Sequence, residues 1–185
     1  KHALGLLEHV KKDFKELTEI MFKSSSFMDR IETTGALSTE HAKGLGVVGV
    51  PARASGIKRD TRVNHPYAAY KEVEFDVPVY HDEGDVYARV KVRIDEVYQS
   101  MRIIEQCFEK MPDGPLKIQI KEIPPYKQAL SYVESPRGEN IYWIMTAPNN
   151  RLFRYKVRSP SFCNWPSIPY TIPGNIVPDF PLINK

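Results

Sequence analysis

The chain has 185 residues, of which 42% are hydrophobic and 26% are charged, and its formal net charge is +3. This composition is typical of a globular protein and excludes an intrinsically disordered chain. No segment approaches the roughly 18 consecutive apolar residues of a membrane-spanning helix, so we expect any membrane association to go through partner proteins. A charge of +3 is too small to indicate nucleic-acid binding.

The cysteines point to a reduced protein without a metal centre of its own. Cys107 and Cys163 lie far apart in the sequence, and no CxxC or HxxxH pair occurs. A zinc or iron–sulfur site held by this chain alone would therefore lack ligands. Two thiols in a chain of this length indicate cytosolic residues rather than a disulfide framework. The chain shows no secretory leader after Lys1, which also favours the cytoplasm.

Two amphipathic patterns predict the main helices. The first places apolar residues at steps of three and four, at Leu4, Leu7, Val10, Phe14, Leu17 and Met21. The second predicts a helix of about 40 Å over residues 86–111. Its apolar stripe consists of Val86, Val90, Ile94, Val97, Met101, Ile104, Phe108 and Met111. Charged residues occupy the opposite face, and we expect other helices to cover the stripe.

Two shorter sequence signals precede the long helix. Ser38 is a candidate N-cap for a helix that stops by Gly44 or Gly46. An acidic turn formed by Asp82, Glu83 and Asp85 precedes the long helix, whose positive N-terminal end it favours.

After Pro115 the pattern changes to the alternation of strands. Residues 116–121, 142–145 and 153–158 are the candidate strands, and Pro148-Asn149-Asn150 is a turn signal. They predict a small antiparallel sheet with one face in the core. The other face is expected to be cationic, because Arg154, Lys156 and Arg158 alternate with apolar residues.

The predicted fold class is α+β, mostly α, with one domain over residues 1–185. Residues 1–115 are expected to be mainly helical, residues 116–159 to form the small sheet, and residues 160–185 to form a proline-rich tail. Seven of the 15 prolines lie from Pro148 onward. Because proline disfavours helix interiors and central strands, we expect an irregular tail that wraps over another part of the chain.

Residues 49–62 combine small residues with a cluster of charges. The glycines and alanines of this segment allow close backbone approach. The charges are those of Arg53, Arg59, Asp60 and Arg62. Two interpretations remain open: a tight loop against a cofactor or a neighbouring subunit, and a helix-packing loop with surface ion pairs. The segment matches neither a Walker loop nor a dinucleotide GxGxxG motif.

The segment Glu134-Ser135-Pro136-Arg137-Gly138-Glu139 can hold one guanidinium in a set direction. Pro136 fixes φ before Arg137, and Gly138 permits a sharp turn after it. Arginine stays charged and donates five hydrogen bonds, which suits a small bound species or an anionic ligand. The alternative is a hairpin turn with an exposed arginine. Farther along, Asn164 is expected to bridge backbone groups and Trp165 to seal a core edge.

Six ordered motifs together resemble the large subunit of membrane-bound, energy-converting nickel–iron hydrogenases and the related quinone-site large subunit of complex I (NADH:quinone oxidoreductase). The resemblance runs from about Gly35 to Lys185. The motifs are residues 49–56 (GVPARASG), 60–62 (DTR), 65–70 (HPYAAY), 84–89 (GDVYAR), 99–104 (QSMRII) and 134–139 (ESPRGE).

The resemblance implies long antiparallel helices with a small sheet, in a multi-subunit redox complex on the cytoplasmic side of a membrane. The implied partners are an iron–sulfur small subunit and other subunits of the complex, without nucleic acid. In the hydrogenases two CxxC pairs hold the nickel–iron centre, because soft thiolates suit these metals. This chain has neither pair. We therefore expect a C-terminal piece of a longer subunit, with no metal or cofactor of its own and inactive alone.

The resemblance also assigns roles to individual residues. Arg137 would lie over the metals and handle dihydrogen and protons, and Pro136 would line the pocket beside it. The expected cofactor-binding residues are Arg53, Ser55, Asp60, Arg62 and Glu134. Complex I relatives usually carry Lys at the position of Arg137, which favours the hydrogenase reading. The alternatives are a metal-free complex I subunit with a quinone pocket, and a scaffold or nucleic-acid-binding domain without a redox role.

Overall fold

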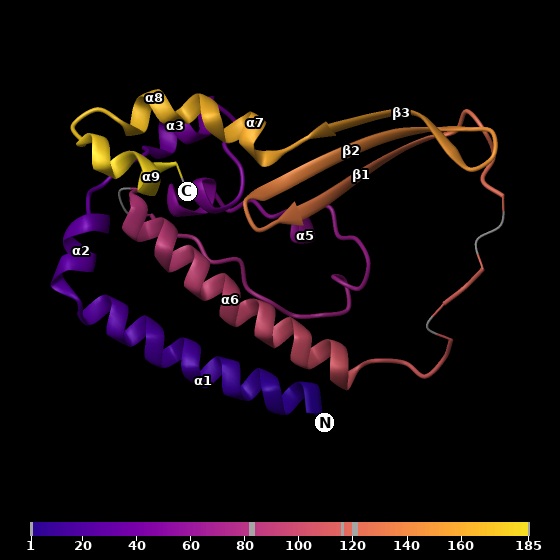
Figure 1. Cartoon of the computed structure of the whole chain (residues 1–185), viewed down its shortest axis with the longest axis horizontal. Coiled ribbons are helices and arrows are strands. Elements are labelled where there is room, and N and C mark those ends of the chain that lie inside the picture. The colour runs from indigo at the N-terminus through magenta and orange to yellow at the C-terminus, as the bar shows by residue number, and fades with distance from the viewer. Residues whose placement is uncertain (1, 82–83, 116, 120–121, 185) are drawn as a thin grey trace.

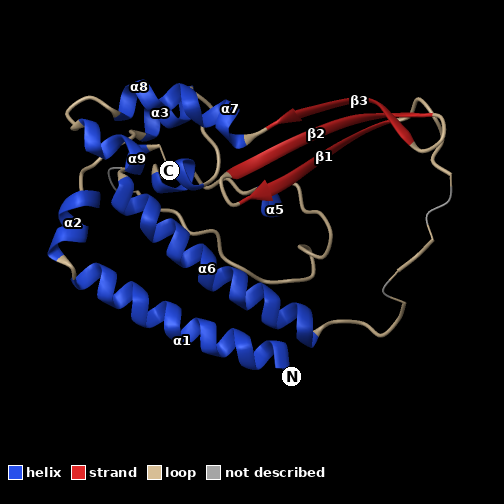
Figure 2. Cartoon of the chain, viewed as in Figure 1, coloured by secondary structure: helices blue, strands red, loops and turns tan. Residues whose placement is uncertain are grey.

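The computed structural model describes residues 2–81, 84–115, 117–119 and 122–184. Two long helices, α1 (His2–Lys23) and α6 (Val86–Glu109), lie side by side, and a three-stranded sheet extends from the opposite side of the fold (Figures 1 and 2). Along the chain, four short helices lie between α1 and α6: α2 (Ser25–Ile31), α3 (Thr39–Gly44), α4 (Val50–Ala54) and α5 (Thr61–Asn64).

The two long helices run antiparallel, as expected. Successive contacts pair the end of α1 with the start of α6: Phe22 packs edge-on against Tyr87, and Phe14 against Tyr98. Farther along, Lys11 Nζ lies 3.3 Å from Glu105 Oε1. Val10 and Leu17, which belong to the predicted apolar stripe of α1, are nevertheless exposed. The helix α6 therefore covers only part of the apolar stripe of α1.

Side-chain caps fix the starts of α3 and α6. Asp85 accepts a hydrogen bond from the backbone N–H of Ala88 at the start of α6, and its other carboxylate oxygen accepts one from Thr33. Ser38 caps α3 by accepting from the backbone N–H of His41, and α3 ends at Gly44. These observations confirm the predicted cap at Ser38, and they show that Asp85 of the predicted acidic turn is the N-cap of α6. Asp82 and Glu83 lie outside the described residues.

The predicted stripe of α6 is only partly correct. Met101 is buried, whereas Ile104 and Phe108 near the C-terminal end are exposed. The most deeply buried residues, Ala88 and Val92, lie on a second face that the stripe did not include. This second face packs against α4 in a small apolar cluster of Val50, Ala54, Ala88 and Val92.

The sheet has the order β1-β2-β3, with both neighbouring pairs antiparallel. Its strands are β1 (Gln128–Ser135), β2 (Gly138–Ala147) and β3 (Arg151–Arg158). The second and third strands and the turn at residues 148–150 agree with the predictions. The strand predicted over residues 116–121 is wrong where it is described, because residues 117–119 have no regular structure. Residues 116, 120 and 121 lie outside the described residues.

The expectation that one face of the sheet lies in the core is wrong for β3. Its apolar side chains are largely uncovered, with Phe153 62% and Tyr155 53% exposed. The sheet is covered mainly at the end where β2 begins, since Gly138 and Glu139 are buried. The far end of the sheet points away from the helices (Figure 1).

The proline-rich tail is helical rather than irregular. Short helices follow one another as α7 (Pro160–Asn164), η1 (Trp165–Ser167), α8 (Ile168–Thr171), η2 (Val177–Asp179) and α9 (Phe180–Ile183). Each has a proline in its first turn, where the missing N–H costs no intrahelical hydrogen bond. The tail does wrap over the chain, as expected. Asn175 accepts a hydrogen bond from the backbone of Gly35, and Arg30 donates one to the backbone of Pro178.

Among the described residues, no helix combines the length and the apolar character that crossing a membrane demands.

Candidate functional site

The turn between β1 and β2 carries Arg137. Ser135 Oγ donates a hydrogen bond to the backbone oxygen of Gly138 at 2.7 Å and accepts one from the backbone N–H of Arg137. Ser135 therefore fastens both sides of the turn. The Arg137 side chain is exposed, and its guanidinium makes no ion pair or hydrogen bond with a residue that the structure describes.

Two glycines bring this turn against the start of α4. Gly49, with φ 71°, is the N-cap of α4, and Gly138 has φ 125°. A Cβ on Gly49 would lie 2.2 Å from the Arg137 backbone oxygen, and a Cβ on Gly138 would lie 2.8 Å from the Gly49 nitrogen. Only glycine fits at these two positions. The close approach suggested by the small residues of segment 49–62 is thus an approach to the Arg137 turn.

We expect Gly49→Ala to destabilise the protein more than Gly174→Ala. Both substitutions place an alanine at positive φ, 71° and 83°, but nothing lies within 4 Å of a Cβ on Gly174. The excess for Gly49→Ala should be about 1–3 kcal/mol, the usual cost of overpacking. Urea unfolding of both variants measures it. Equal losses of stability would show that the Arg137 turn does not depend on this contact.

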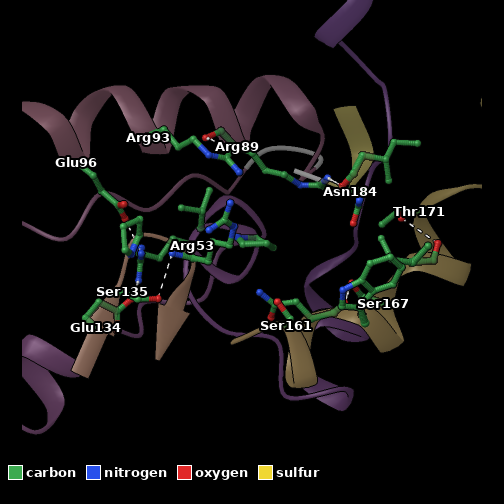
Figure 3. A pocket seen from close by; sticks show the side chains of 18 of the residues that line it. Arg53, Arg89, Arg93, Glu96, Glu134, Ser135, Ser161, Ser167, Thr171 and Asn184 are labelled. Carbon is green, nitrogen blue, oxygen red and sulfur yellow. Dashed lines mark hydrogen bonds and ion pairs between the residues drawn. The ribbon is translucent and has the colours of Figure 1, made fainter. Parts of the chain in front are cut away.

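Arg53 of α4 is the centre of a buried ion-pair cluster (Figure 3). Its side chain is 1% exposed, and its guanidinium lies 2.6 Å from Glu96 Oε1 and 3.0 Å from Glu134 Oε1. It also donates a hydrogen bond to the backbone oxygen of Arg59. Asp60 lies farther away, at 3.7 Å. One guanidinium therefore neutralises carboxylates from three different segments of the chain.

Asp60 and Arg62 form the second ion pair of the cluster. Asp60 caps α5, and its two carboxylate oxygens accept hydrogen bonds from Arg62 Nε and a terminal guanidinium nitrogen at 2.9 and 2.6 Å. Burial alone raises the pKa of Asp60, but the hydrogen bonds and charge of Arg62, with the charge of Arg53, outweigh it and leave the pKa below its ordinary value. Asp60 is therefore an ionised structural anchor.

The two carboxylates nearest Arg53 differ in their surroundings. Glu134 Oε1 accepts from Arg53, and Glu134 Oε2 accepts from the backbone N–H of Thr61 at 3.0 Å. Glu96, in contrast, has its pKa raised by burial, against the opposing charges of Arg53 and Arg62. Its side chain keeps 17% exposure.

A cavity of about 990 Å³ lies beside this cluster, between α6, the Arg137 turn and the tail helices (Figure 3). Its charged lining is mostly cationic, with five guanidiniums facing two carboxylates: Arg53, Arg62, Arg89, Arg93, Arg137, Glu96 and Glu134. The rest of the lining is uncharged. Its apolar members are Val50, Pro51, Val97, Pro136, Trp165, Ile168 and Ile183, and its polar members are Ser100, Ser135, Ser161, Asn164, Ser167, Thr171 and Asn184. Such a cavity suits a compact species that is anionic or develops negative charge.

Arg89 and Arg93 of α6 were not among the predicted site residues. Arg89 is buried and donates to the backbone oxygens of Gly35, Gly84 and Ile183. Burial, with repulsion from Arg93, lowers the pKa of Arg89 to about 10. Burial also lowers the pKa of Arg93, despite attraction by Glu96, and the charge of Arg137 lowers it further. The spacing of 89, 93 and 96 on one helical face is the signal that could have identified them.

The predicted site residues fall into two groups, those that line the cavity and those that lie behind its wall. Arg53, Arg62, Glu134, Pro136 and Arg137 line the cavity. Two further residues lie behind the wall: Asp60 in the buried cluster, and Ser55, whose hydroxyl donates to the backbone oxygen of Leu37 at 2.9 Å.

The interpretation of Asn164 is confirmed, and that of Trp165 is not. The Asn164 side chain accepts from the backbone N–H of Val48 and donates to its oxygen, so it bridges both groups. Trp165 is 52% exposed and lines the cavity instead of sealing a core edge.

The donor set of the cavity does not fit a nickel–iron centre. No thiol is among its lining residues, and the described part of the chain contains no group of three or more His, Cys, Asp or Glu that is placed to hold a metal ion. Cys107 is exposed, and Cys163 contacts the guanidinium of Arg158. The described residues therefore supply a charged wall and no metal ligands.

Comparison with known proteins relates the chain to two kinds of redox complex. It is 36% identical to formate hydrogenlyase subunit 5 of Escherichia coli K12, over 96% of this chain and 31% of that protein. It is 35% identical to a subunit of the NADH-quinone oxidoreductase of Akkermansia muciniphila, over 99% of this chain and 50% of that protein. It is 33% identical to hydrogenase-4 component G of Escherichia coli K12, over 98% of this chain and 30% of that protein.

The chain thus spans between about a third and a half of the length of these relatives. A family model described as "Respiratory-chain NADH dehydrogenase, 49 Kd subunit" matches residues 1–130 and 119–184, which together cover nearly all of it. The resemblance inferred from the six motifs is confirmed. The chain belongs to the family of the 49 kDa subunit of the respiratory-chain NADH dehydrogenase, and it is also similar to formate hydrogenlyase subunit 5 and hydrogenase-4 component G.

Proposed function

We propose that this chain is part of the catalytic large subunit of a membrane-associated oxidoreductase of the nickel–iron hydrogenase type, which oxidises or evolves H₂. The observation that carries the proposal is Arg137, which lines the cavity on a turn fastened by Ser135 and makes no ion pair with a described residue. The names of two relatives, formate hydrogenlyase subunit 5 and hydrogenase-4 component G, support this side of the family.

Arg137 would act on a small species in the cavity by charge and hydrogen bonding. Its guanidinium stays protonated at any working pH and donates in a fixed plane. Ser135 and the close contact between Gly49 and Gly138 fix the backbone of the turn, so the point from which the Arg137 side chain extends is set before a ligand arrives. A donor carried on a fixed backbone favours electrostatic stabilisation of developing charge. Arg53, Arg62 and Glu134 hold the wall behind it.

Any nickel and iron would need ligands from beyond the described lining of this cavity, since that lining contains no thiol. We therefore propose that the chain alone is inactive and that it works within a longer subunit of hydrogenase-type fold. An iron–sulfur subunit would exchange electrons with it, on the cytoplasmic face of a membrane. The relatives' names, which include formate hydrogenlyase and NADH-quinone oxidoreductase, support membership of such a complex.

The test uses the intact protein assembled with its partner subunits. We expect H₂-dependent reduction of a viologen dye, together with stoichiometric bound nickel. The isolated chain of 185 residues should show neither. An assembled complex that lacks nickel and shows no H₂-dependent activity would contradict the proposal.

A metal-free quinone pocket is the second candidate function. The observations that favour it are the apolar part of the cavity wall, including Trp165 and Ile168, and the similarity to the NADH-quinone oxidoreductase protein of Akkermansia muciniphila over 99% of this chain. Reduction of a ubiquinone analogue by the assembled complex, without bound nickel, would support this candidate over the first.

A further inference from the structure

We propose that Glu96 of α6 is the residue that exchanges protons between the cavity and solvent. The assignment rests on the proposed function, because H₂ oxidation releases protons and quinone reduction consumes them. Either reaction therefore needs a group at the cavity that accepts a proton and passes it on. Acid–base groups of this kind are usually His, Glu, Asp, Lys, Tyr or Cys side chains.

The lining of the cavity leaves two residues of these types. Among its described lining residues there is no His, Asp, Lys, Tyr or Cys, and the two carboxyl groups are those of Glu96 and Glu134. The arginines stay protonated and do not serve as exchangeable acids. The choice therefore lies between Glu96 and Glu134.

Both carboxylate oxygens of Glu134 already accept hydrogen bonds from the chain. Arg53 and the backbone N–H of Thr61 donate one hydrogen bond to each of its carboxylate oxygens, both at 3.0 Å, and its side chain is 5% exposed. Neither oxygen of Glu134 is therefore left without a donor from the chain.

Glu96 has the opposite environment. Arg53 engages Oε1 alone, and Oε2 accepts no hydrogen bond from a residue that the structure describes. Arg53 is shared with Glu134 and Asp60, so its charge is divided among three carboxylates. With 17% exposure, the Glu96 side chain lines the cavity and still reaches solvent.

The charged groups around Glu96 come from several elements. Arg53 of α4 and Arg62 of α5 lower its pKa, whereas burial and the charge of Asp60 raise it, and the net direction is upward. Arg93, one turn earlier on α6, attracts Glu96 by its charge. Glu134 of β1 shares the guanidinium of Arg53 with Glu96. A carboxyl with a raised pKa takes up and releases a proton nearer neutral pH than an ordinary glutamate does.

The proposed step is a proton transfer. The bond between a proton donor in the cavity and its proton breaks as the O–H bond of Glu96 forms, and this O–H bond breaks in turn when the proton passes to a solvent water molecule, which becomes its carrier. The direction reverses when the reaction consumes protons. No electrons move to or from the chain in this step.

The test compares Glu96→Gln, Glu96→Asp and the control Glu105→Gln in the intact, assembled protein. Glu105 lies on the same helix but pairs with Lys11, away from the cavity. We expect Glu96→Gln to lower turnover about 100-fold, at the lower end of the range for positioned acid–base catalysis, with KM unchanged and a larger solvent deuterium isotope effect. Glu96→Asp should recover part of this loss, and Glu105→Gln should match the wild type.

An isotope-edited infrared titration of the intact protein tests the same assignment without using activity. The carboxylic acid band of Glu96 should disappear on ionisation at a pH above the ordinary glutamate range, and it should be absent in Glu96→Gln. Unchanged turnover and pH profile in Glu96→Gln would overturn the proton-exchange role while leaving the proposed function intact. If the assembled wild type lacks both activities, the proposed function fails and the proton-exchange role fails with it. An infrared band that titrates as stated would then show only that the pKa of Glu96 is raised.

Discussion

Replacing Arg137 by Lys in the intact, assembled protein should lower turnover by about two to three orders of magnitude, as loss of a preorganised donor at a reacting centre commonly does. An ammonium retains the charge, but it lacks the planar array of five donors that a guanidinium presents. Stability should not change, because the Arg137 side chain is exposed and makes no ion pair with a described residue. The turnover number and the urea midpoint measure the two effects separately.

The matched control for this substitution is Arg154→Lys. Arg154 is an exposed arginine on β3 and does not line the cavity. Its replacement should leave turnover within two-fold of the wild type, as expected for a surface position. If Arg137→Lys retains full turnover, the cavity does not work through the guanidinium, and the proposed function loses its main support.

Arg53→Met should destabilise the protein by about 3–5 kcal/mol, the usual cost of removing one partner from a buried ion pair. Methionine preserves much of the side-chain volume, so the loss reports mainly on charge. Without Arg53, Glu96 and Glu134 face each other's charge in a buried site, and Asp60 keeps only Arg62 as its partner. Urea unfolding of the chain measures the change.

Arg102→Met is the control for the loss of a surface ion pair. Arg102 pairs with Glu74 and Asp76, whose side chains are largely exposed, and such pairs contribute at most about 1 kcal/mol. A loss for Arg53→Met as small as that for Arg102→Met would mean that the cluster is not needed to hold the cavity wall. The Arg137 turn would then depend on the glycine contact alone.

The sequence predicted the elements whose signals are local. The start of α6 at Val86, directly after the predicted acidic turn, and the cap of α3 at Ser38 follow from side chains within three residues of the helix end. The turn at residues 148–150 could also be predicted from local sequence, because Asn149 and Asn150 tolerate the positive φ that they adopt.

The elements that depend on distant contacts were harder to predict. In β1, residues 128–135 lack a clean alternation, since Ala129, Leu130 and Val133 do not fall on one face. Its pairing with β2 decides its conformation. The alternating segment at 116–121 has no such partner where it is described. In the tail, proline suggests broken helices, although each helix has its proline in the first turn, where it is tolerated.

Only some of the residues that line the cavity could be predicted from the sequence. Arg53 and Arg137 stand out because glycine, alanine and proline surround them. Arg89 and Arg93 resemble residues on the solvent-facing side of a long helix, because a single helical period cannot show that several neighbours enclose its N-terminal half. The pattern misses Glu96 for the same reason, although it lies on the same face of α6.

The contact between Gly49 and Gly138 fixes one end of the sheet independently of the other end. Because the Arg137 turn is seated against α4 through the backbone, its position is independent of the distal loops. We therefore expect that the connection between α6 and β1 can differ in length among relatives without displacing the turn. The family match divides into two overlapping parts at residues 119–130, within and just after this connection, and the alignment with the Akkermansia muciniphila protein extends over 210 residues against the 185 of this chain. We expect an insertion in this connection to leave the position of the Arg137 turn unchanged.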